Sequence, residues 1–335
     1  MGGQVVTGAG VAEACDTAPL MRSLHIVAPR RASTVELPRP EPAPGEVRVS
    51  LEGSGICGSD LPVWDGRPWF DYPRPPGTPG HEGWGRVDAV GPGVETLAIG
   101  DRVATLGLSA FAEYQVIAAE EAIVLPPSLD AQPFPGEPLG CAANVFARAE
   151  IGSDDTVAVI GVGFLGAIVV ALAVAAGARV VAVARRPTAR RIARELGAVL
   201  ALSPAEDIIS PIRELTGGDL CDVVVEAAGV QETLDLCAPL TRNRGRLVVA
   251  GFHQDGPRQV DMQLWNWRGL DVVNAHERDP AVYAAGVRAA IVAVEDGRIP
   301  LQRLITHRVE LQHLDEAFSL ATERPDGFMK AVVLR

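Results

Sequence analysis

The feature that most constrains the fold is a glycine-rich turn in the middle of the chain. Thr156–Ile160 reads as a short buried strand, and Gly161-Val-Gly-Phe-Leu-Gly166 follows it directly. The apolar run Leu165–Ala176 then predicts a helix that ends at Gly177. A strand, a Gly-x-Gly-x-x-Gly turn and a helix in this order are typical of a dinucleotide site. We expect the cofactor to contact Gly161, Gly163, Phe164, Leu165 and Gly166.

Strand and helix patterns keep alternating after this turn. The expected strands are Arg179–Ala184, Cys221–Glu226 and Arg246–Ala250, with a helix over Thr188–Leu196. Such alternation predicts an α/β domain with a doubly wound parallel sheet. Residues before this region read differently, as short strands cut by glycine and proline, which predicts an antiparallel, barrel-like domain. Its expected strands are Leu24–Ala28, Glu46–Glu52, Gly85–Val90, Arg102–Leu106 and Ala112–Ile117.

A chain of 335 residues is too long for one hydrophobic core, so two domains are expected. We predict a flexible tail over residues 1–20, a catalytic domain over 21–150 and a dinucleotide domain over 151–290. Residues 291–335 are expected to return to the catalytic domain, with a helix at Leu314–Thr322 and a closing strand at Ala331–Leu334.

Composition excludes several classes of protein. A net charge of −12 disfavours binding to nucleic acid or anionic membranes. Lys330 is the only lysine, and no tyrosine precedes it by four residues, which excludes a Tyr-x-x-x-Lys catalytic pair. The apolar run Ala167–Ala176 is well short of the ~20 residues that a membrane helix needs. The five cysteines are widely spaced and odd in number, which favours a reducing compartment, and we expect a cytoplasmic protein.

Three residues in separate segments could bind one metal ion. Cys57, His81 and Glu137 stand in Cys-Gly-Ser-Asp, Gly-His-Glu and Glu-Pro-Leu. A thiolate, an imidazole and a carboxylate can fill three corners of a zinc tetrahedron and leave the fourth for substrate or water. Glu82 and Cys141 are alternatives to Glu137 as the third ligand. Asp60 is a plausible acceptor for the second nitrogen of His81, which would fix its tautomer.

The end of the second strand of the dinucleotide domain bears on coenzyme choice. An acidic residue there would bind the ribose hydroxyls of NAD and repel a 2′-phosphate. This strand ends at Ala184 and is followed by Arg185 and Arg186. Guanidinium groups pair well with phosphate, so NADP(H) is favoured over NAD(H). The alternative is that both arginines are solvated or stack on adenine and that NAD is still accepted.

Taken in order, these motifs resemble the zinc-dependent medium-chain dehydrogenase family over Met21 to Arg335. Gly-Asp-Arg-Val at Gly100 also matches, and Glu-Pro-Leu at Glu137 is most similar to the sorbitol and threonine dehydrogenase branch. The resemblance implies a GroES-like β-barrel catalytic domain, a Rossmann domain and an active site in the cleft between them. It also implies a homodimer or homotetramer and catalytic roles for Cys57, Ser59, His81, Glu82 and Glu137.

Three departures from the family pattern qualify this picture. No cysteine lies between Arg86 and Val116, where many members hold a structural zinc, so one catalytic zinc per chain is expected. Pro62 replaces a histidine that often passes protons to solvent. The resemblance assigns the alcohol proton to Ser59, from which water, Glu82 or Asp65 would have to complete the transfer. Glu277 stands about where polyol dehydrogenases have arginine, which argues against a sorbitol-like substrate.

The substrate pocket is the least defined part of the prediction. Trp64, Trp69 and Phe70 could wall the cleft, and the resemblance places Asn266, His276 and Glu277 near substrate or a subunit contact. We expect a zinc-dependent, NADP-preferring dehydrogenase of a secondary alcohol, polyol, cyclic alcohol or amino alcohol, which also reduces the ketone. The alternatives are a zinc-free quinone or enoyl reductase of the same superfamily and a non-catalytic dinucleotide-binding protein.

Overall fold

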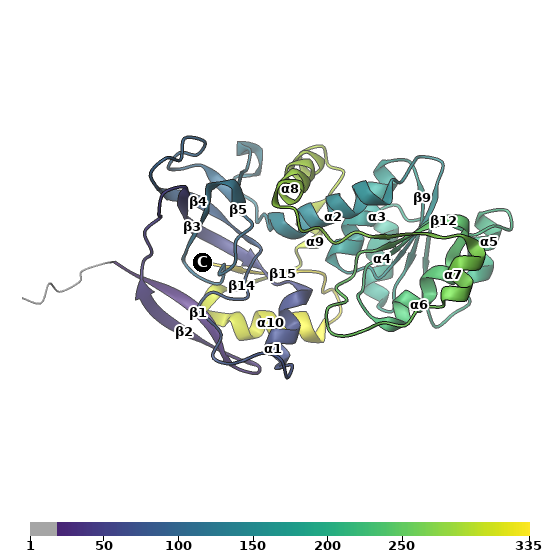
Figure 1. Cartoon of the computed structure of the whole chain (residues 1–335), viewed down its shortest axis with the longest axis horizontal. Coiled ribbons are helices and arrows are strands. Elements are labelled where there is room, and N and C mark those ends of the chain that lie inside the picture. The colour runs from purple at the N-terminus through teal and green to yellow at the C-terminus, as the bar shows by residue number, and fades with distance from the viewer. Residues whose placement is uncertain (1–18) are drawn as a thin grey trace, which may run out of the picture.

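The computed structural model describes residues 19–335, and Figure 1 shows two lobes along its long axis. Most of the tail predicted for residues 1–20 therefore lies outside the described residues. The left-hand lobe holds the first strands of the chain together with the C-terminus, and the right-hand lobe holds the middle of the chain. No helix within residues 19–335 is both long and apolar enough to cross a membrane.

The right-hand lobe is built on a parallel sheet of six strands in the order β10-β9-β8-β11-β12-β13. The chain order reverses between the central strands β8 and β11, which is the point where doubly wound sheets bind ligands. This confirms the predicted parallel sheet. The short edge strands had not been predicted. The bounds are β8 Thr156–Ile160, β9 Arg179–Val183, β10 Leu200–Leu202, β11 Cys221–Glu226, β12 Thr241–Val249 and β13 Asp271–Asn274.

Helices cover the parallel sheet. The first of them, α3 (Phe164–Ala175), starts directly after the glycine turn, and its residues are apolar on nearly every side because it is buried all round. Helix α4 (Pro187–Glu195) begins with a proline at its first position, where a missing N–H costs nothing. The others on this lobe are α5 Ile209–Leu215, α6 Gln231–Leu240 and α7 Met262–Arg268.

The left-hand lobe contains a seven-stranded sheet in the order β14-β15-β3-β4-β5-β7, with β6 paired to β3 and a separate β1–β2 hairpin. Strand β15 pairs with β3 and places Val332 opposite Gly55, so the chain does return to its first lobe. The strands are β1 Leu20–Ala28, β2 Arg31–Pro38, β3 Glu46–Gly55, β4 Gly83–Val90, β5 Arg102–Thr105, β6 Tyr114–Ala118, β7 Ala122–Val124, β14 His307–Glu310 and β15 Ala331–Leu334.

Short helices complete this lobe. Helix α10 (Leu314–Glu323) packs its buried face against β14, β15 and the short helix α1 (Leu61–Asp65). Single 3₁₀ turns occur at η1 Gly58–Asp60, η2 Ala119–Glu121, η3 Pro127–Leu129 and η4 Leu311–His313. The fold class is confirmed. The exact domain boundaries at residues 150 and 290 stay predictions.

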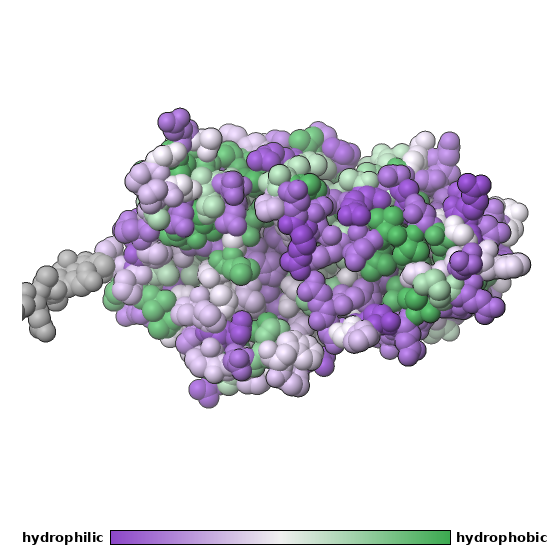
Figure 2. Space-filling view, in the orientation of Figure 1, coloured by the Kyte–Doolittle hydropathy of each residue, from purple (hydrophilic) through white to green (hydrophobic). Residues whose placement is uncertain are grey.

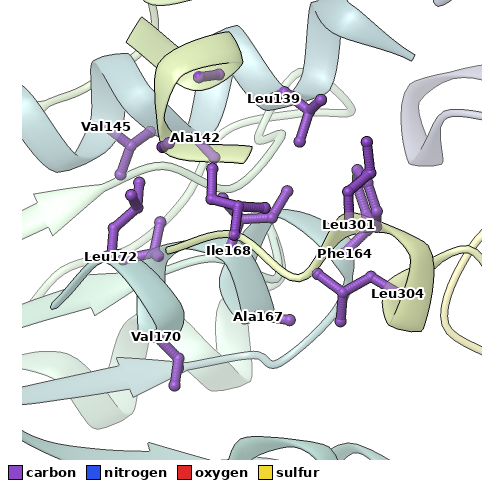
Figure 3. Packing of buried hydrophobic residues seen from close by; sticks show 14 of the residues in the cluster. Leu139, Ala142, Val145, Phe164, Ala167, Ile168, Val170, Leu172, Leu301 and Leu304 are labelled. Atoms are coloured by element: carbon purple, nitrogen blue, oxygen red, sulfur yellow. The ribbon is translucent and has the colours of Figure 1, made fainter. Parts of the chain in front are cut away.

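Helices between the lobes join their cores. Helix α2 (Gly136–Ala149) packs on α3 and α8 (Pro280–Glu295), and α9 (Leu301–Leu304) lies close by (Figure 1). Figure 3 shows side chains of α2, α3 and α9, including Leu139, Ile168 and Leu301, gathered in one cluster. Leu139 has no exposed surface, and truncating such a leucine to alanine costs about 2–5 kcal/mol. This shared core holds Glu137, on the first turn of α2, at the junction of the lobes.

Candidate active site

Cys57 and His81 lie in two loops that follow and precede neighbouring strands. The backbone N–H of Cys57 donates to Asp60 Oδ2 at 2.9 Å, which fixes the loop after β3. Nδ1 of His81 lies 2.8 Å from the carbonyl oxygen of Pro79 and 3.3 Å from Asp60 Oδ1. Because both acceptors lie on the Nδ1 side, the neutral ring carries its proton on Nδ1. The lone pair of Nε2 is then free to bind a metal ion. Asp60 thus lies where the sequence places it, beside His81.

Glu82 completes a cluster with these two residues. One ligand atom each of Cys57, His81 and Glu82 lies within 4.8 Å of the others. The carboxylate of Glu82 is fully buried, and its Oε2 atom has no hydrogen-bond partner. A Cβ on Gly55 would lie 1.8 Å from this oxygen, so glycine is needed for the approach. A thiol, an imidazole and a carboxylate oxygen are donor types that fit a zinc ion.

The single lysine of the chain contacts this cluster. Lys330 Nζ donates to Glu82 Oε1 at 2.6 Å and to the carbonyl oxygen of Ile56 at 2.8 Å. It also lies 2.5 Å from Glu82 Oε2, although that contact lacks hydrogen-bond geometry. The ammonium group lies 5.0 Å from the centre of the Phe164 ring, which belongs to the glycine turn. Lys330 therefore joins the cluster of Cys57, His81 and Glu82 to the glycine turn, a role that the sequence alone did not indicate.

Charges inside the cluster shift several pKa values. Burial alone would lower the pKa of His81, but Asp60 and Cys57 raise it well above its ordinary value. Burial raises the pKa of Glu82, and Lys330 and His81 oppose that rise. Burial lowers and Glu82 raises the pKa of Lys330, with a net increase that keeps it charged. The site is therefore a buried arrangement of opposite charges in which each group depends on its neighbours.

Glu137 lies beside this trio but is held by other residues. The hydroxyl of Tyr283, on α8, donates to Glu137 Oε1. Cys141 Sγ lies 2.8 Å from the Tyr283 oxygen and 3.5 Å from the same carboxylate oxygen. Burial and the charge of Glu137 raise the pKa of the Cys141 thiol, so it stays protonated. Tyr283 was missed by sequence reasoning because it lies 146 residues from its partner.

The glycine turn has the geometry that a dinucleotide needs. Gly161 has a φ of 95°, and a Cβ there would lie 2.7 Å from the Cβ of Ala228. A Cβ on Gly166 would lie 2.0 Å from the carbonyl oxygen of Gly161, so helix and turn pack in direct contact. A Cβ on Gly163 meets nothing within 4 Å, which leaves open space over the turn. Phe164 and Leu165 begin α3, whose N-terminal amides face that space.

The arginines after β9 have distinct environments. Ala184 is buried, Arg185 is exposed and Arg186 is half-buried. Nη1 of Arg186 donates to the carbonyl oxygen of Phe328 at 2.6 Å, which ties it to the C-terminal segment. Arg190, one turn along α4, donates to the carbonyl oxygens of Ala184 and Arg185. No acidic side chain stands at the end of β9, as the sequence had indicated.

The other predicted site residues are spread over the molecule. Ser59 is half-buried beside Cys57, and Asp65 accepts a two-pronged bond from Arg30. Trp64 is 3% exposed and stacks on Phe318 at 4.7 Å, so it belongs to the hydrophobic core and does not wall a cleft. Trp69 is 54% exposed.

The residues of the dinucleotide domain that were expected near substrate also lie in different places. Asn266 is exposed on α7, at the far end of the right-hand lobe in Figure 1, and does not join the cluster. His276 is close enough to Glu137 for that charge to act on it, although burial and Arg278 leave its pKa lowered. Glu277 accepts bonds from the backbone N–H groups of Arg278 and Asp279, which makes it a turn-forming residue before α8.

Both lobes match models of known protein families. Residues 43–127 match the alcohol dehydrogenase GroES-like domain, and residues 165–308 match the zinc-binding dehydrogenase model. Among curated proteins, the starvation-sensing protein RspB of Escherichia coli is 31% identical, over 90% of this chain and 95% of its own. The (R,R)-butanediol dehydrogenase of Bacillus subtilis is 30% identical, over 85% and 91%. The L-threonine 3-dehydrogenase of Pyrococcus abyssi is 28% identical, over 86% and 91%.

Solved structures agree with this relationship. The alcohol dehydrogenase RspB of Escherichia coli in complex with NADH superimposes with a TM-score of 0.83 at 28% identity, covering 94% of this chain and 99% of that one. A zinc-binding dehydrogenase of Sinorhizobium meliloti bound to NADP gives 0.82 at 28% identity, covering 95% and 100%. The chain belongs to the zinc-binding, medium-chain alcohol dehydrogenase family and is an NAD(P)-dependent alcohol dehydrogenase.

Proposed function

We propose that this protein is a dehydrogenase that interconverts a secondary alcohol and its ketone, uses NADP(H) in preference to NAD(H), and holds one zinc ion per chain. The observation that carries the proposal is the contact chain from Glu82 through Lys330 to Phe164. It brings a buried metal-binding cluster and the cofactor turn together at one place. Hydride transfer requires the substrate oxygen and the nicotinamide to meet in this way.

Cys57, His81 and a glutamate are the proposed zinc ligands. A carboxylate oxygen of Glu82 lies within 4.8 Å of the Cys57 and His81 ligand atoms, although Lys330 is paired with the same carboxylate, whereas Glu137 accepts a bond from Tyr283 and is outside this group. We therefore propose Glu82 as the third zinc ligand. Glu137 would then lie beside the fourth coordination position, which is left for substrate or water. When bound, zinc would supply Lewis-acid polarisation of the substrate oxygen. Only Leu106–Glu113 separates β5 from β6, without a cysteine, which supports the absence of a second zinc.

The chain's own residues would orient substrate and move its proton. Ser59 is two residues from Cys57 and half-buried, so its hydroxyl is a suitable first acceptor for the proton of the alcohol. Pro62 has no titratable group, and Asp65 is engaged by Arg30. The remaining routes for the proton are water and Glu82. Deep burial of Glu82 leaves water as the simpler exit from Ser59.

Coenzyme preference and substrate class rest on separate observations. Ala184 in place of an acid, followed by Arg185 and Arg186, favours the 2′-phosphate of NADP. Relatives named for butanediol and threonine support a secondary hydroxyl next to a second polar group. His276 is close enough to Glu137 to feel its charge, and we propose that His276 binds this second polar group of the substrate. Trp69 and Phe70 remain candidates for the apolar wall.

We also propose that the protein forms a homodimer through the edge of its parallel sheet. Strand β13 is one of the two edge strands of this sheet, and its residues Asp271, Val272 and Asn274 are exposed. Trp267, on the adjoining helix α7, is 87% exposed. Figure 2 shows hydrophobic side chains gathered on this lobe beside α7. An exposed edge strand beside apolar surface is suited to pairing with a second copy.

The metal assignment is tested with Cys57→Ala and a matched control, Cys237→Ala, which removes a buried thiol from the core of the dinucleotide lobe. We expect about one zinc per chain in the wild type and the control. Cys57→Ala should lose the zinc and at least about 100-fold in turnover, while its affinity for NADPH is retained. Wild-type turnover and zinc content in Cys57→Ala would refute the ligand assignment.

The substrate class is tested by following reduced nicotinamide with both coenzymes against butanediols, threonine, tetritols and cyclic polyols. A secondary alcohol should be oxidised faster with NADP than with NAD. Exhaustive chelation should abolish that activity. If chelated protein instead reduces quinones or enones at full rate, the zinc-free reductase would be the correct function.

A further inference from the structure

The segment that follows α10 crosses from the catalytic lobe to the dinucleotide lobe. Arg324 ends α10 with a φ of 48°, and its Nε donates to the carbonyl oxygen of Ala321 at 3.2 Å. Beyond it, the N–H of Gly327 donates to Thr188 Oγ1 at 3.2 Å, and that hydroxyl donates to Asp326. These bonds fasten residues 324–328 to the first turn of α4. The ribose of the adenosine half of a dinucleotide lies at this end of β9 in doubly wound folds.

The bond from Arg186 to Phe328 and the bonds around Thr188 bring the loop after α10 to the arginines that follow β9, and the charges of Arg185, Arg186 and Arg324 act on one another there. Desolvation and the charge of Arg185 lower the pKa of Arg324, and desolvation and the charge of Arg324 lower that of Arg186. Arg324 is itself exposed, so an anion in solvent can reach its guanidinium group. Within residues 19–335, no carboxylate forms an ion pair with any of the three.

The neighbouring carboxylates are already engaged. Asp326 accepts bonds from Thr188, and the N–H of Gly327 also acts on it. Glu195 binds Arg191 at 2.7 Å and Arg303 at 2.9 Å. Arg185, Arg186 and Arg324 therefore have no paired carboxylate among the described residues, although Arg185 and Arg324 are exposed and Arg186 is half-buried. Like charges held together in this way are stabilised by a bound anion.

We propose that Arg324, a residue of the catalytic lobe, completes the binding site for the adenosine 2′-phosphate of NADP. This inference rests on the proposed NADP preference and adds a specificity residue outside the dinucleotide lobe. A phosphate with about two negative charges can accept charge-assisted bonds from several guanidinium groups at once. NAD would leave the three charges unneutralised. Coenzyme choice thus depends on both lobes, because the tie between Phe328 and Arg186 fixes the loop that carries Arg324.

The test uses Arg324→Asn, because asparagine tolerates the left-handed backbone that this position requires. Affinities are measured by calorimetry for adenosine 2′,5′-bisphosphate and 5′-AMP, and by fluorescence for NADPH and NADH. We expect Arg324→Asn to weaken the binding of the bisphosphate and of NADPH about 10-fold or more. The affinities for 5′-AMP and NADH should change by no more than about 2-fold. The matched control is Arg191→Ala, which removes a paired arginine from the same region and should change nothing.

Each outcome separates the inference from the proposal on which it depends. If the wild type binds the bisphosphate no tighter than 5′-AMP, the NADP preference itself is wrong. If the wild type binds the bisphosphate more tightly than 5′-AMP, but Arg324→Asn lowers both affinities equally or changes neither, Arg324 does not recognise the 2′-phosphate. Arg324→Lys keeps the charge without the planar fork and should show an intermediate loss. Unchanged thermal midpoints establish that the variants are folded.

Discussion

Lys330 Nζ and Glu82 Oε1 are 2.6 Å apart in a buried ion pair between the residue before β15 and the residue before β4. The pair joins the start of the last strand of the chain to the loops that carry Cys57 and His81. Because the same ammonium lies over the ring of Phe164, the pair also connects those loops to the cofactor turn. A charge of this kind is costly to bury alone, so each partner depends on the other.

Replacing Lys330 with methionine should therefore destabilise the protein. The variant leaves the Glu82 carboxylate buried and unpaired, which costs about 3–5 kcal/mol of unfolding free energy in comparable sites. The measurement is urea denaturation of the metal-free protein. The double variant Lys330→Met with Glu82→Gln removes both charges and should recover most of the loss. A single variant within about 1 kcal/mol of the wild type would show that the pair is not a coupled unit.

Tyr283→Phe tests how Glu137 is oriented. The change removes one hydroxyl that contacts Glu137 and Cys141, and leaving a buried carboxylate oxygen without its donor costs about 1–3 kcal/mol. We expect lower stability and a fall in kcat/KM, with zinc content unchanged if Glu82 is the third ligand, as we propose. Tyr114→Phe, on the catalytic lobe, is the control. Loss of zinc in Tyr283→Phe would instead place Glu137 among the ligands.

The dimer proposal is tested at the exposed tryptophan of α7. Trp267→Glu puts a charge into the apolar surface beside the sheet edge and should shift the protein from dimer towards monomer. The mass is measured by light scattering during size-exclusion chromatography over a range of concentrations. Ile99→Glu alters an equally exposed apolar residue on the other lobe, at 71% exposure, and should leave the mass unchanged. Identical masses for both variants and the wild type would exclude this interface.

Glu113 predicts a specific dependence of stability on pH. Burial tends to raise its pKa, but bonds from the backbone and side chain of Arg22 lower it below the ordinary value of 4.5. A lowered pKa in the folded state stabilises the protein above the unfolded pKa, and that contribution is lost as the pH falls through the folded value. Glu113→Gln should therefore flatten the loss of stability below about pH 4.5. Glu95→Gln, which changes an exposed glutamate, is the control. If both variants lose stability equally as the pH falls below about 4.5, Glu113 does not have this role.

Much of the fold could be predicted because its signals are local. The buried strand Thr156–Ile160, the glycine turn and the closing strand Ala331–Leu334 fall where the sequence placed them. Turn glycines and runs of apolar residues depend on neighbours a few positions away. The edge strands β10 and β13 were missed because three or four residues carry too little pattern to recognise.

The candidate site was predicted in part. Cys57, His81 and Glu82 stand in short motifs, and the sequence supplied all three. It ranked Glu137 above Glu82 as a ligand, and that ranking stays a prediction. Trp64 looked like a cleft residue because aromatic residues cluster after the first loop, whereas packing against Phe318 buries it.

The amino-acid order alone determined the two-lobed α/β architecture, the donor types available for a metal and the absence of an acid after β9. Only the tertiary structure decided which donors meet. Lys330 reaches Glu82 across 248 positions, Tyr283 reaches Glu137 across 146, and Arg324 approaches Arg185 from another lobe. Such contacts arise from how sheets and helices pack, and packing depends on the whole set of buried side chains, which no local pattern in a sequence contains.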